Sequence, residues 1–338
     1  MTRYLFTSVT RISDLAKQDF EVAKLDRERW QTGDYIVGEV TDAHCTYRSL
    51  ELPSGRMMEA MEGDLAVGSL GARAATLEAV GDWRAMESDD FEALTSAGLF
   101  GKTTSTSPFL GSLLKLRYRG HVLRGGEPVT MTSCLPDLPH RDFQIPVVLI
   151  IGTSMSAGKT LSGRTIVHLL TQQGKRVVGA KLTGAARYRD VLSYADAGAT
   201  AVFDFVDAGL PSSVCPEPLY RTRLDYLLSR IAEAEPDVVV AEAGASPLEP
   251  YNGKTAIEVL GSRIRFELLC AQDPYSVLGV RNAFAREPDL ISGGAANTSA
   301  GIELVRKLTG LPALNLLDPG SHRQLKDMLL AALNWNAG

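Results

Sequence analysis

The sequence predicts an α/β protein: a mostly parallel sheet with helices on both faces, preceded by a smaller β-rich domain. After about residue 146, continuous apolar runs alternate with helical segments, which is typical of a parallel sheet. Before residue 134, short runs alternate apolar and polar residues, which is typical of a small barrel or sandwich. Residues 135–145, with Pro136 and Pro139, have the composition of a linker. We therefore expect domains over 1–134 and 146–338.

The first domain is predicted from runs with a period of two residues. The expected strands are 35–40, 65–68, 75–80, 114–118 and 128–131, with a helix near 88–98. Residues 98–103 contain Gly-Lys-Thr, but no buried strand precedes them, so we interpret them as an ordinary loop. The hydroxyl-rich residues 104–108 beside them are a candidate pocket lining.

The second domain is predicted from apolar runs and helical periodicity. The expected strands are 147–151, 177–180, 238–241, 266–271, 289–292 and 312–316, and the expected helices are 160–173, 219–234 and 299–309. Asp204 lies between Phe203 and Phe205, a pattern that suggests a further strand with an inward-facing carboxylate.

Composition excludes several classes of protein. The chain has 338 residues, is 45% hydrophobic and carries a net charge of −5, so it is neither disordered nor a good binder of nucleic acid. No apolar run approaches the ~20 residues of a membrane-spanning helix. Four cysteines far apart in sequence, without an export signal, indicate reduced thiols in the cytoplasm.

The most specific motif follows the first strand of the second domain. A buried run leads into a loop of small residues, then Gly-Lys-Thr, then a helix, which is the context of a phosphate-binding P-loop and predicts a P-loop NTPase-like fold. The predicted phosphate-binding residues are Gly152, Thr153, Ser154, Met155, Ser156, Ala157, Gly158, Lys159, Thr160 and Leu161. Lys159 would face solvent without ligand and contact the β- and γ-phosphates, and the Thr160 hydroxyl would bind Mg²⁺. The first glycine is one position earlier than in the common pattern.

Other candidate residues follow the ends of predicted strands, where ligands bind in open α/β sheets. Lys181 is placed to stabilise a phosphoryl group during its transfer. Glu242 ends an apolar strand, and Mg²⁺ beside Thr160 is its natural partner. Gly244 permits close approach of a ligand, and Gln272 is a candidate pocket residue. Arg187 and Arg189 are candidates for binding a substrate carboxylate.

The second domain resembles dethiobiotin synthetase over about residues 145–320. The resemblance lies in the loop 152–160 with its shifted glycine, in Lys181 after its strand, and in Glu242-Ala243-Gly244. It implies ATP binding, Mg²⁺ and a carboxylate or amine substrate, with one of Asp190, Asp196 and Asp204 helping to hold the metal. We place Asp204 with Thr160 and Glu242, and Asp190 near the substrate. Ala185 and Ala186 stand where that family has a substrate-binding serine, so the substrate differs.

The same segment resembles a related P-loop family that includes D-glutamate N-acetyltransferases, through residues 201–209 and 247–253. Three functions stay open. The first is an ATP- and Mg²⁺-dependent ligase or synthetase that activates a small carboxylate, with Lys159, Lys181 and Glu242 catalytic. The second is an N-acyltransferase whose loop binds the phosphates of acetyl-CoA and whose acceptor is an amino acid. The third is a nucleotide-dependent switch. We expect a homodimer or higher homo-oligomer.

Overall fold

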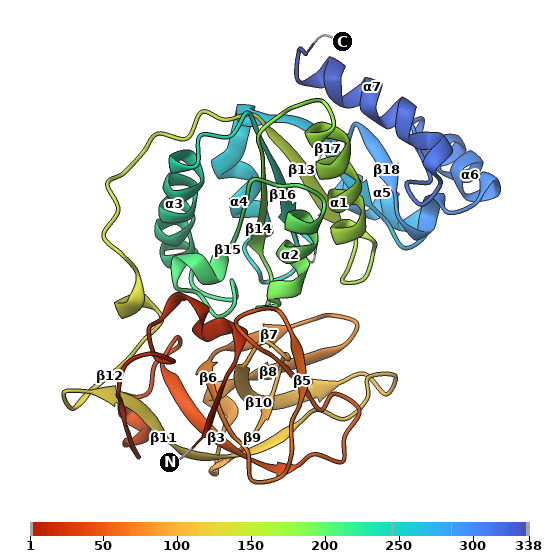
Figure 1. Cartoon of the computed structure of the whole chain (residues 1–338). Coiled ribbons are helices and arrows are strands. Elements are labelled where there is room, and N and C mark those ends of the chain that lie inside the picture. Colours follow the sequence, from red (N-terminus) through yellow and green to blue (C-terminus); the bar gives the residue numbers. More distant parts are fainter. Residues whose placement is uncertain (1–2, 245, 285, 336–338) are drawn as a thin grey trace. The chain divides into compact units, whose positions relative to one another are not determined.

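The computed structural model describes residues 3–244, 246–284 and 286–335 (Figure 1). Its contacts group the chain into two compact units. Unit 1 contains the described residues of Met1–Leu138, Gly184–Arg189 and Phe205–Arg223, and unit 2 contains those of Pro139–Thr183, Asp190–Asp204 and Leu224–Gly338. Two short segments that we expected in the second domain therefore group with the first. The linker predicted over 135–145 stays a prediction.

Unit 2 is built on a parallel sheet of strands rich in Val, Ile and Leu. Its strands are β13 (Val147–Gly152), β14 (Val177–Thr183), β15 (Ala201–Asp204), β16 (Val238–Ala243), β17 (Ile264–Cys270) and β18 (Leu290–Ser292). The helices in and around it are α1 (Lys159–Thr171), α2 (Tyr188–Asp196), α3 (Glu217–Glu233), α4 (Gly253–Leu260), α5 (Pro274–Phe284), α6 (Ser299–Thr309) and α7 (His322–Ala332). The first residues of α2 and α3 group with unit 1.

The sheet has the order β15-β14-β16-β13-β17-β18, and every pairing in it is parallel. Every residue of β13, β14 and β16 is buried, which requires cover on both faces of the sheet. Helices α1 and α7 pack together in one hydrophobic core with Val148 and Ile150 of β13. The predicted α/β fold with a parallel sheet is confirmed.

Unit 1 is β-rich, as predicted. Its strands are β1 (Tyr4–Phe6), β2 (Glu21–Ala23), β3 (Tyr35–Asp42), β4 (Ser49–Glu51), β5 (Met57–Glu59), β6 (Leu65–Leu70), β7 (Ala72–Ala74), β8 (Ala79–Asp82), β9 (Asp90–Ala93), β10 (Leu99–Thr106), β11 (Lys115–Arg124) and β12 (Glu127–Pro128). Five of them form a closed ring, β6-β3-β11-β9-β10, because β10 also pairs with β6 in parallel. The core of this barrel contains Phe91, Phe100, Leu116 and Tyr118.

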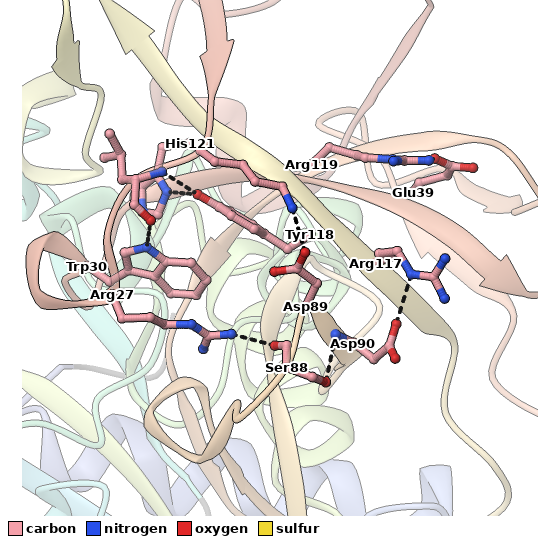
Figure 2. A network of polar contacts seen from close by, with 12 residues as sticks. Arg27, Trp30, Glu39, Ser88, Asp89, Asp90, Arg117, Tyr118, Arg119 and His121 are labelled. Carbon is pink, nitrogen blue, oxygen red and sulfur yellow. Dashed lines mark hydrogen bonds and ion pairs between the residues drawn. The ribbon is translucent and has the colours of Figure 1, made fainter.

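A buried polar cluster lies on the inner face of β11. The His121 ring contacts the Tyr118 hydroxyl at 2.6 Å through Nδ1 and the Asp34 carboxylate at 3.2 Å through Nε2. Trp30 packs against Tyr118, with ring centroids 4.6 Å apart and the ring planes tilted by 48° (Figure 2). On the outer face of β11, Arg117 pairs with Asp90, and Arg119 pairs with Glu39 (Figure 2). The alternation of these faces is what the period of two predicted.

Some predicted elements were wrong. Residues 88–98 contain strand β9 and no helix, because Phe91 and Ala93 alternate into the barrel core. The Gly-Lys-Thr at 101–103 lies inside strand β10, so it is not a loop. Residues 75–80 include the turn between β7 and β8, and 128–131 contain only the end of β12. Pro312–Leu316 forms no strand; Ala313 makes an isolated bridge to Ile291.

No helix in the described part of the chain is long and apolar enough to cross a membrane.

Candidate functional site

The loop between β13 and α1 is a tight turn that ends at the first residue of the helix. Ser156 has φ 61° and Gly158 has φ 101°, and both values lie in the left-handed region. Successive backbone N–H groups in such a turn make an anion-binding concavity, and the N-terminus of the 13-residue helix α1 adds its partial positive charge. A loop of this kind can bind an anion such as phosphate.

Lys159 is folded back over this loop. Its Nζ donates a hydrogen bond to the Ser154 carbonyl at 2.8 Å, and the residue is only 5% exposed, so the expectation that it faces solvent was wrong. A Cβ atom at position 152 would lie 2.9 Å from Cδ and Nζ of Lys159, so Gly152 makes room for the lysine side chain. Burial lowers the pKa of Lys159, while the Glu242 carboxylate opposes that shift. A bound anion would stabilise the buried ammonium group.

Thr160 and Glu242 lie side by side. The Thr160 hydroxyl donates to Oε2 of Glu242 at 2.9 Å, although the residues are 82 positions apart in the sequence. The Tyr194 hydroxyl donates to the same Oε2 atom at 3.2 Å. Burial, followed by the charge of Glu242, raises the pKa of Tyr194 well above its usual value. Glu242 is thus held in one orientation by two hydroxyl groups.

Four residues occupy paired positions on four neighbouring strands of the sheet. Ile150 of β13 pairs with Glu242 of β16, Glu242 pairs with Lys181 of β14, and Lys181 pairs with Asp204 of β15. Residues that pair in register on parallel strands project from the same face of the sheet. Two carboxylates and one ammonium group therefore form a row near the carboxyl ends of the strands, where α/β proteins bind ligands.

Lys181 forms an ion pair with Asp190, the third residue of α2. Burial would lower the pKa of Lys181, but Asp190 and Glu242 outweigh burial and hold that pKa above its usual value. Lys181 is therefore a buried, fully charged group one strand away from Glu242. A cation held in this way can stabilise negative charge that develops on a bound phosphate.

The far side of the loop is supported from the end of β17. Gln272 donates its backbone N–H to the Thr153 hydroxyl at 3.2 Å and its side-chain amide to the Met155 carbonyl at 3.3 Å. Gly158 and Gly293 pass each other closely, since a Cβ atom on Gly158 would lie 3.5 Å from the Cα atom of Gly293. Gln272 thus contacts the loop itself, and its place as a substrate residue stays a prediction.

The remaining predicted residues lie at different distances from this row. Gly244 follows β16, and a Cβ atom there would lie 3.2 Å from Oε1 of Glu242. Leu161, on the first turn of α1, is 46% exposed. Asp204 is separated from Glu242 by β14, and Asp196 is exposed at the end of α2. Arg187 and Arg189 are exposed and group with unit 1.

Sequence reasoning missed Tyr194. Its ring packs against Gly163 of α1 and Gly179 of β14, where a Cβ atom would lie 2.4 Å and 2.6 Å from tyrosine atoms. A glycine inside a helix and another inside a buried strand were the available signal, because both positions disfavour glycine unless something packs closely there.

No group of three or more His, Cys, Asp and Glu side chains within the described residues is arranged to hold a metal ion. A hydroxyl–carboxylate pair such as Thr160 and Glu242 nevertheless suits Mg²⁺, which takes few protein ligands and completes its shell with phosphate oxygens and water. The donor set at the loop therefore fits a magnesium–phosphate complex.

No family model and no curated protein matches the chain. Among solved structures, it is similar to HypB from Helicobacter pylori in complex with nickel, at 16% identity, over 57% of this chain and 90% of that chain, with a TM-score of 0.38. It is also similar to a DUF1611 family protein from Anabaena variabilis, at 17% identity, over 60% of this chain and 63% of that chain, with a TM-score of 0.37. A third similar structure is the signal recognition particle 54 kDa protein from Aeropyrum pernix in complex with GDP. The identity is 16%, the match covers 56% of this chain and 48% of that chain, and the TM-score is 0.34.

Proposed function

We propose that unit 2 binds a Mg²⁺–nucleoside triphosphate, with ATP as the first candidate, and transfers its terminal phosphoryl group. The carrying observation is the arrangement of Lys159 over the loop, beside the bonded pair of Thr160 and Glu242. The loop N–H groups and Lys159 supply positive charge to phosphate oxygens, while the hydroxyl–carboxylate pair suits a divalent cation. Together they match the two charged parts of a magnesium–nucleotide complex.

Each residue has a defined task in this proposal. The Thr160 hydroxyl and Glu242 would hold Mg²⁺, which supplies charge neutralisation at the phosphates when it is bound. The Tyr194 hydroxyl keeps Glu242 oriented. Lys159 would leave the Ser154 carbonyl and donate to the phosphates instead, because a phosphate oxygen is the stronger acceptor for an ammonium group.

The buried, charged side chain of Lys181 favours transfer of the phosphoryl group to an acceptor molecule as the reaction. We propose a small carboxylate as that acceptor. Its oxygen would attack the terminal phosphorus, the bond to the bridging oxygen would break, and an acyl phosphate and nucleoside diphosphate would form. Lys181, kept charged by Asp190 and Glu242, would stabilise the negative charge spread over the transferred group. An amine that displaces the phosphate would complete an amide-forming ligase or synthetase reaction.

Calorimetric titration with ATP plus Mg²⁺, and separately with acetyl-CoA, tests the proposal. We expect ATP to bind only weakly without Mg²⁺ and acetyl-CoA not to bind. Tight Mg²⁺-independent binding of acetyl-CoA would instead support the acyltransferase. Release of nucleoside diphosphate is then assayed with pooled small carboxylates and amines. Release that no carboxylate stimulates would leave the nucleotide-dependent switch as the better description.

A further inference from the structure

Unit 1 contains a cleft of about 680 Å³ that is separate from the barrel core. Two segments line it: residues 12–17, and residues 124–134, which begin at the last residue of β11 and pass through β12. Both segments belong to the first 138 residues and therefore to unit 1. Small-molecule sites commonly have volumes of about 300–1,000 Å³, so the cleft has the size of a ligand site.

An ion pair joins the two walls of the cleft. The Arg124 guanidinium donates to Oδ1 of Asp14 at 2.8 Å and to Oδ2 at 3.3 Å. Hydrogen bonding to Arg124 lowers the pKa of Asp14, and hydrogen bonding to Asp14 raises the pKa of Arg124, so both groups are charged at neutral pH. A guanidinium has five N–H groups and a carboxylate has about four acceptor sites, so both side chains keep bonding capacity beyond this pair.

The charges that line the cleft are balanced on each wall. One wall carries Asp14 and the exposed Lys17, and the other carries Arg124 and Glu127, whose side chain is 82% exposed. A ligand with charges of one sign would be attracted by one group on each wall and repelled by the other. A zwitterion matches both signs at once.

Apolar groups lie between these charges. Val129 is buried, and Ile12 and Pro128 are partly buried. The Cys134 thiol also lines the cleft, and burial raises its pKa, so the thiol stays neutral at pH 7. A neutral thiol behaves as a small hydrophobic group. The cleft therefore offers a small apolar surface next to a cation and an anion.

We propose that this cleft binds a zwitterionic amino acid with an apolar side chain. The carboxylate of the ligand would accept from N–H groups of Arg124 that Asp14 does not use, and its ammonium group would donate to the remaining acceptor sites of Asp14. Its side chain would pack on Ile12, Val129 and Cys134. The inference is independent of the proposed function, because it uses residues of unit 1 alone.

Calorimetry on the full-length chain without nucleotide is the first test. The ligands are L-leucine, L-methionine and L-phenylalanine, together with N-acetyl-L-leucine, which lacks the ammonium group, and L-leucinamide, which lacks the carboxylate. We expect at least one of the three amino acids to bind, and both leucine analogues to bind at least about tenfold more weakly than leucine, because each loses charge-assisted hydrogen bonds. No binding by any of the three, or an analogue that binds as well as leucine, overturns the proposal.

The second test compares Arg124→Gln and Asp14→Asn with Arg119→Gln. Arg119 is the matched control, because it is also an ion-paired arginine on β11 but does not line the cleft. Exposed ion pairs contribute little to stability, so all three variants should fold, which circular dichroism verifies. We expect the first two to weaken binding of the amino acid at least about tenfold and Arg119→Gln to leave it unchanged. Unchanged affinity in folded Arg124→Gln overturns the proposal.

Thiol labelling locates the bound ligand within the chain. Iodoacetamide modification is followed by mass spectrometry at Cys134 and at Cys45, a second partly exposed cysteine of unit 1 that does not line the cleft. A saturating amino acid should slow modification of Cys134 several-fold and leave that of Cys45 unchanged. Equal rates at Cys134 with and without a bound amino acid would place the ligand elsewhere and overturn the proposal.

Discussion

Both units bury polar side chains, but they do so in different ways. In the barrel, His121 bonds to both Asp34 and Tyr118, and the ring of Trp30 packs against the rings of Tyr118 and His121. In the α/β unit, Lys181 and Glu242 lie near the carboxyl ends of parallel strands, and Lys159 begins helix α1 after a loop with left-handed backbone angles. In the first cluster, the polar side chains are hydrogen-bond partners of one another. In the second cluster, burial lowers the pKa of Lys159, and the charge of Lys181 lowers it further.

The comparison shows why residue type alone does not identify a site. An aspartate, a histidine and a tyrosine in contact look like catalytic groups, yet all three are buried and bonded, which is the arrangement that stabilises a core. Lys159, by contrast, is buried, and the hydrogen-bond acceptor described for its ammonium group is a backbone carbonyl. A buried ammonium group beside a loop that can bind an anion is the feature that indicates a ligand. The following substitutions test this distinction, beginning with the largest expected effect.

Lys159→Ala should reduce nucleotide turnover at least about 100-fold, the scale of one preorganised electrostatic contact. The loss follows from removing the only ammonium group that contacts the loop among the contacts described. Steady-state release of nucleoside diphosphate measures it, with circular dichroism to verify folding. Near-normal turnover in a folded variant would show that this loop is not the reaction site.

His121→Leu should act on stability alone. It leaves the Tyr118 hydroxyl and the Asp34 carboxylate each without one buried partner, which we expect to cost about 2 kcal/mol in the free energy of unfolding. Urea denaturation measures the cost. The affinity for ATP should not change, and a tenfold weaker affinity in a folded variant would contradict a purely structural cluster.

Glu242→Gln should shift the Mg²⁺ concentration for half-maximal activity upward by about tenfold, because the amide keeps the shape and loses the charge that the cation requires. The comparison is a Mg²⁺ titration of turnover at saturating ATP. Asp204→Asn, one strand beyond Lys181, is the matched variant for deciding which carboxylate the metal needs. An unchanged Mg²⁺ titration in Glu242→Gln would assign Glu242 a structural role.

Arg117→Ala should change almost nothing. Both side chains of its ion pair with Asp90 are exposed to solvent, so the free energy of unfolding should change by less than about 0.5 kcal/mol. Urea denaturation at two salt concentrations is the check. A loss above about 1 kcal/mol would mean that the outer face of β11 contributes to stability as much as its inner face does.

The parallel sheet and the loop were predictable because their signals are local. A fully buried strand reads as a continuous apolar run, and the Gly-Lys-Thr at 158–160 needs only its flanking strand and helix to be interpreted. The failures involve contacts distant in sequence. Residues 90–93 became a strand because β10 and β11 flank them on both sides, and the pairing of Tyr194 with Glu242 depends on how α2 packs.

The pairing of distant segments in unit 1 has a consequence for the order in which the chain folds during synthesis. The hydrogen bond from Arg189 to Glu51 joins residues 138 positions apart, and the bond from Arg11 to Asp207 joins residues 196 positions apart. A ribosome that has released the whole barrel sequence has not yet supplied residues 184–189 and 205–223, which complete this unit. Glu51 and Arg11 therefore form these contacts only after β13 and β14 of the parallel sheet have been translated, and the contact with Asp207 follows the synthesis of β15. The N-terminal unit can therefore finish folding only late in the synthesis of the chain.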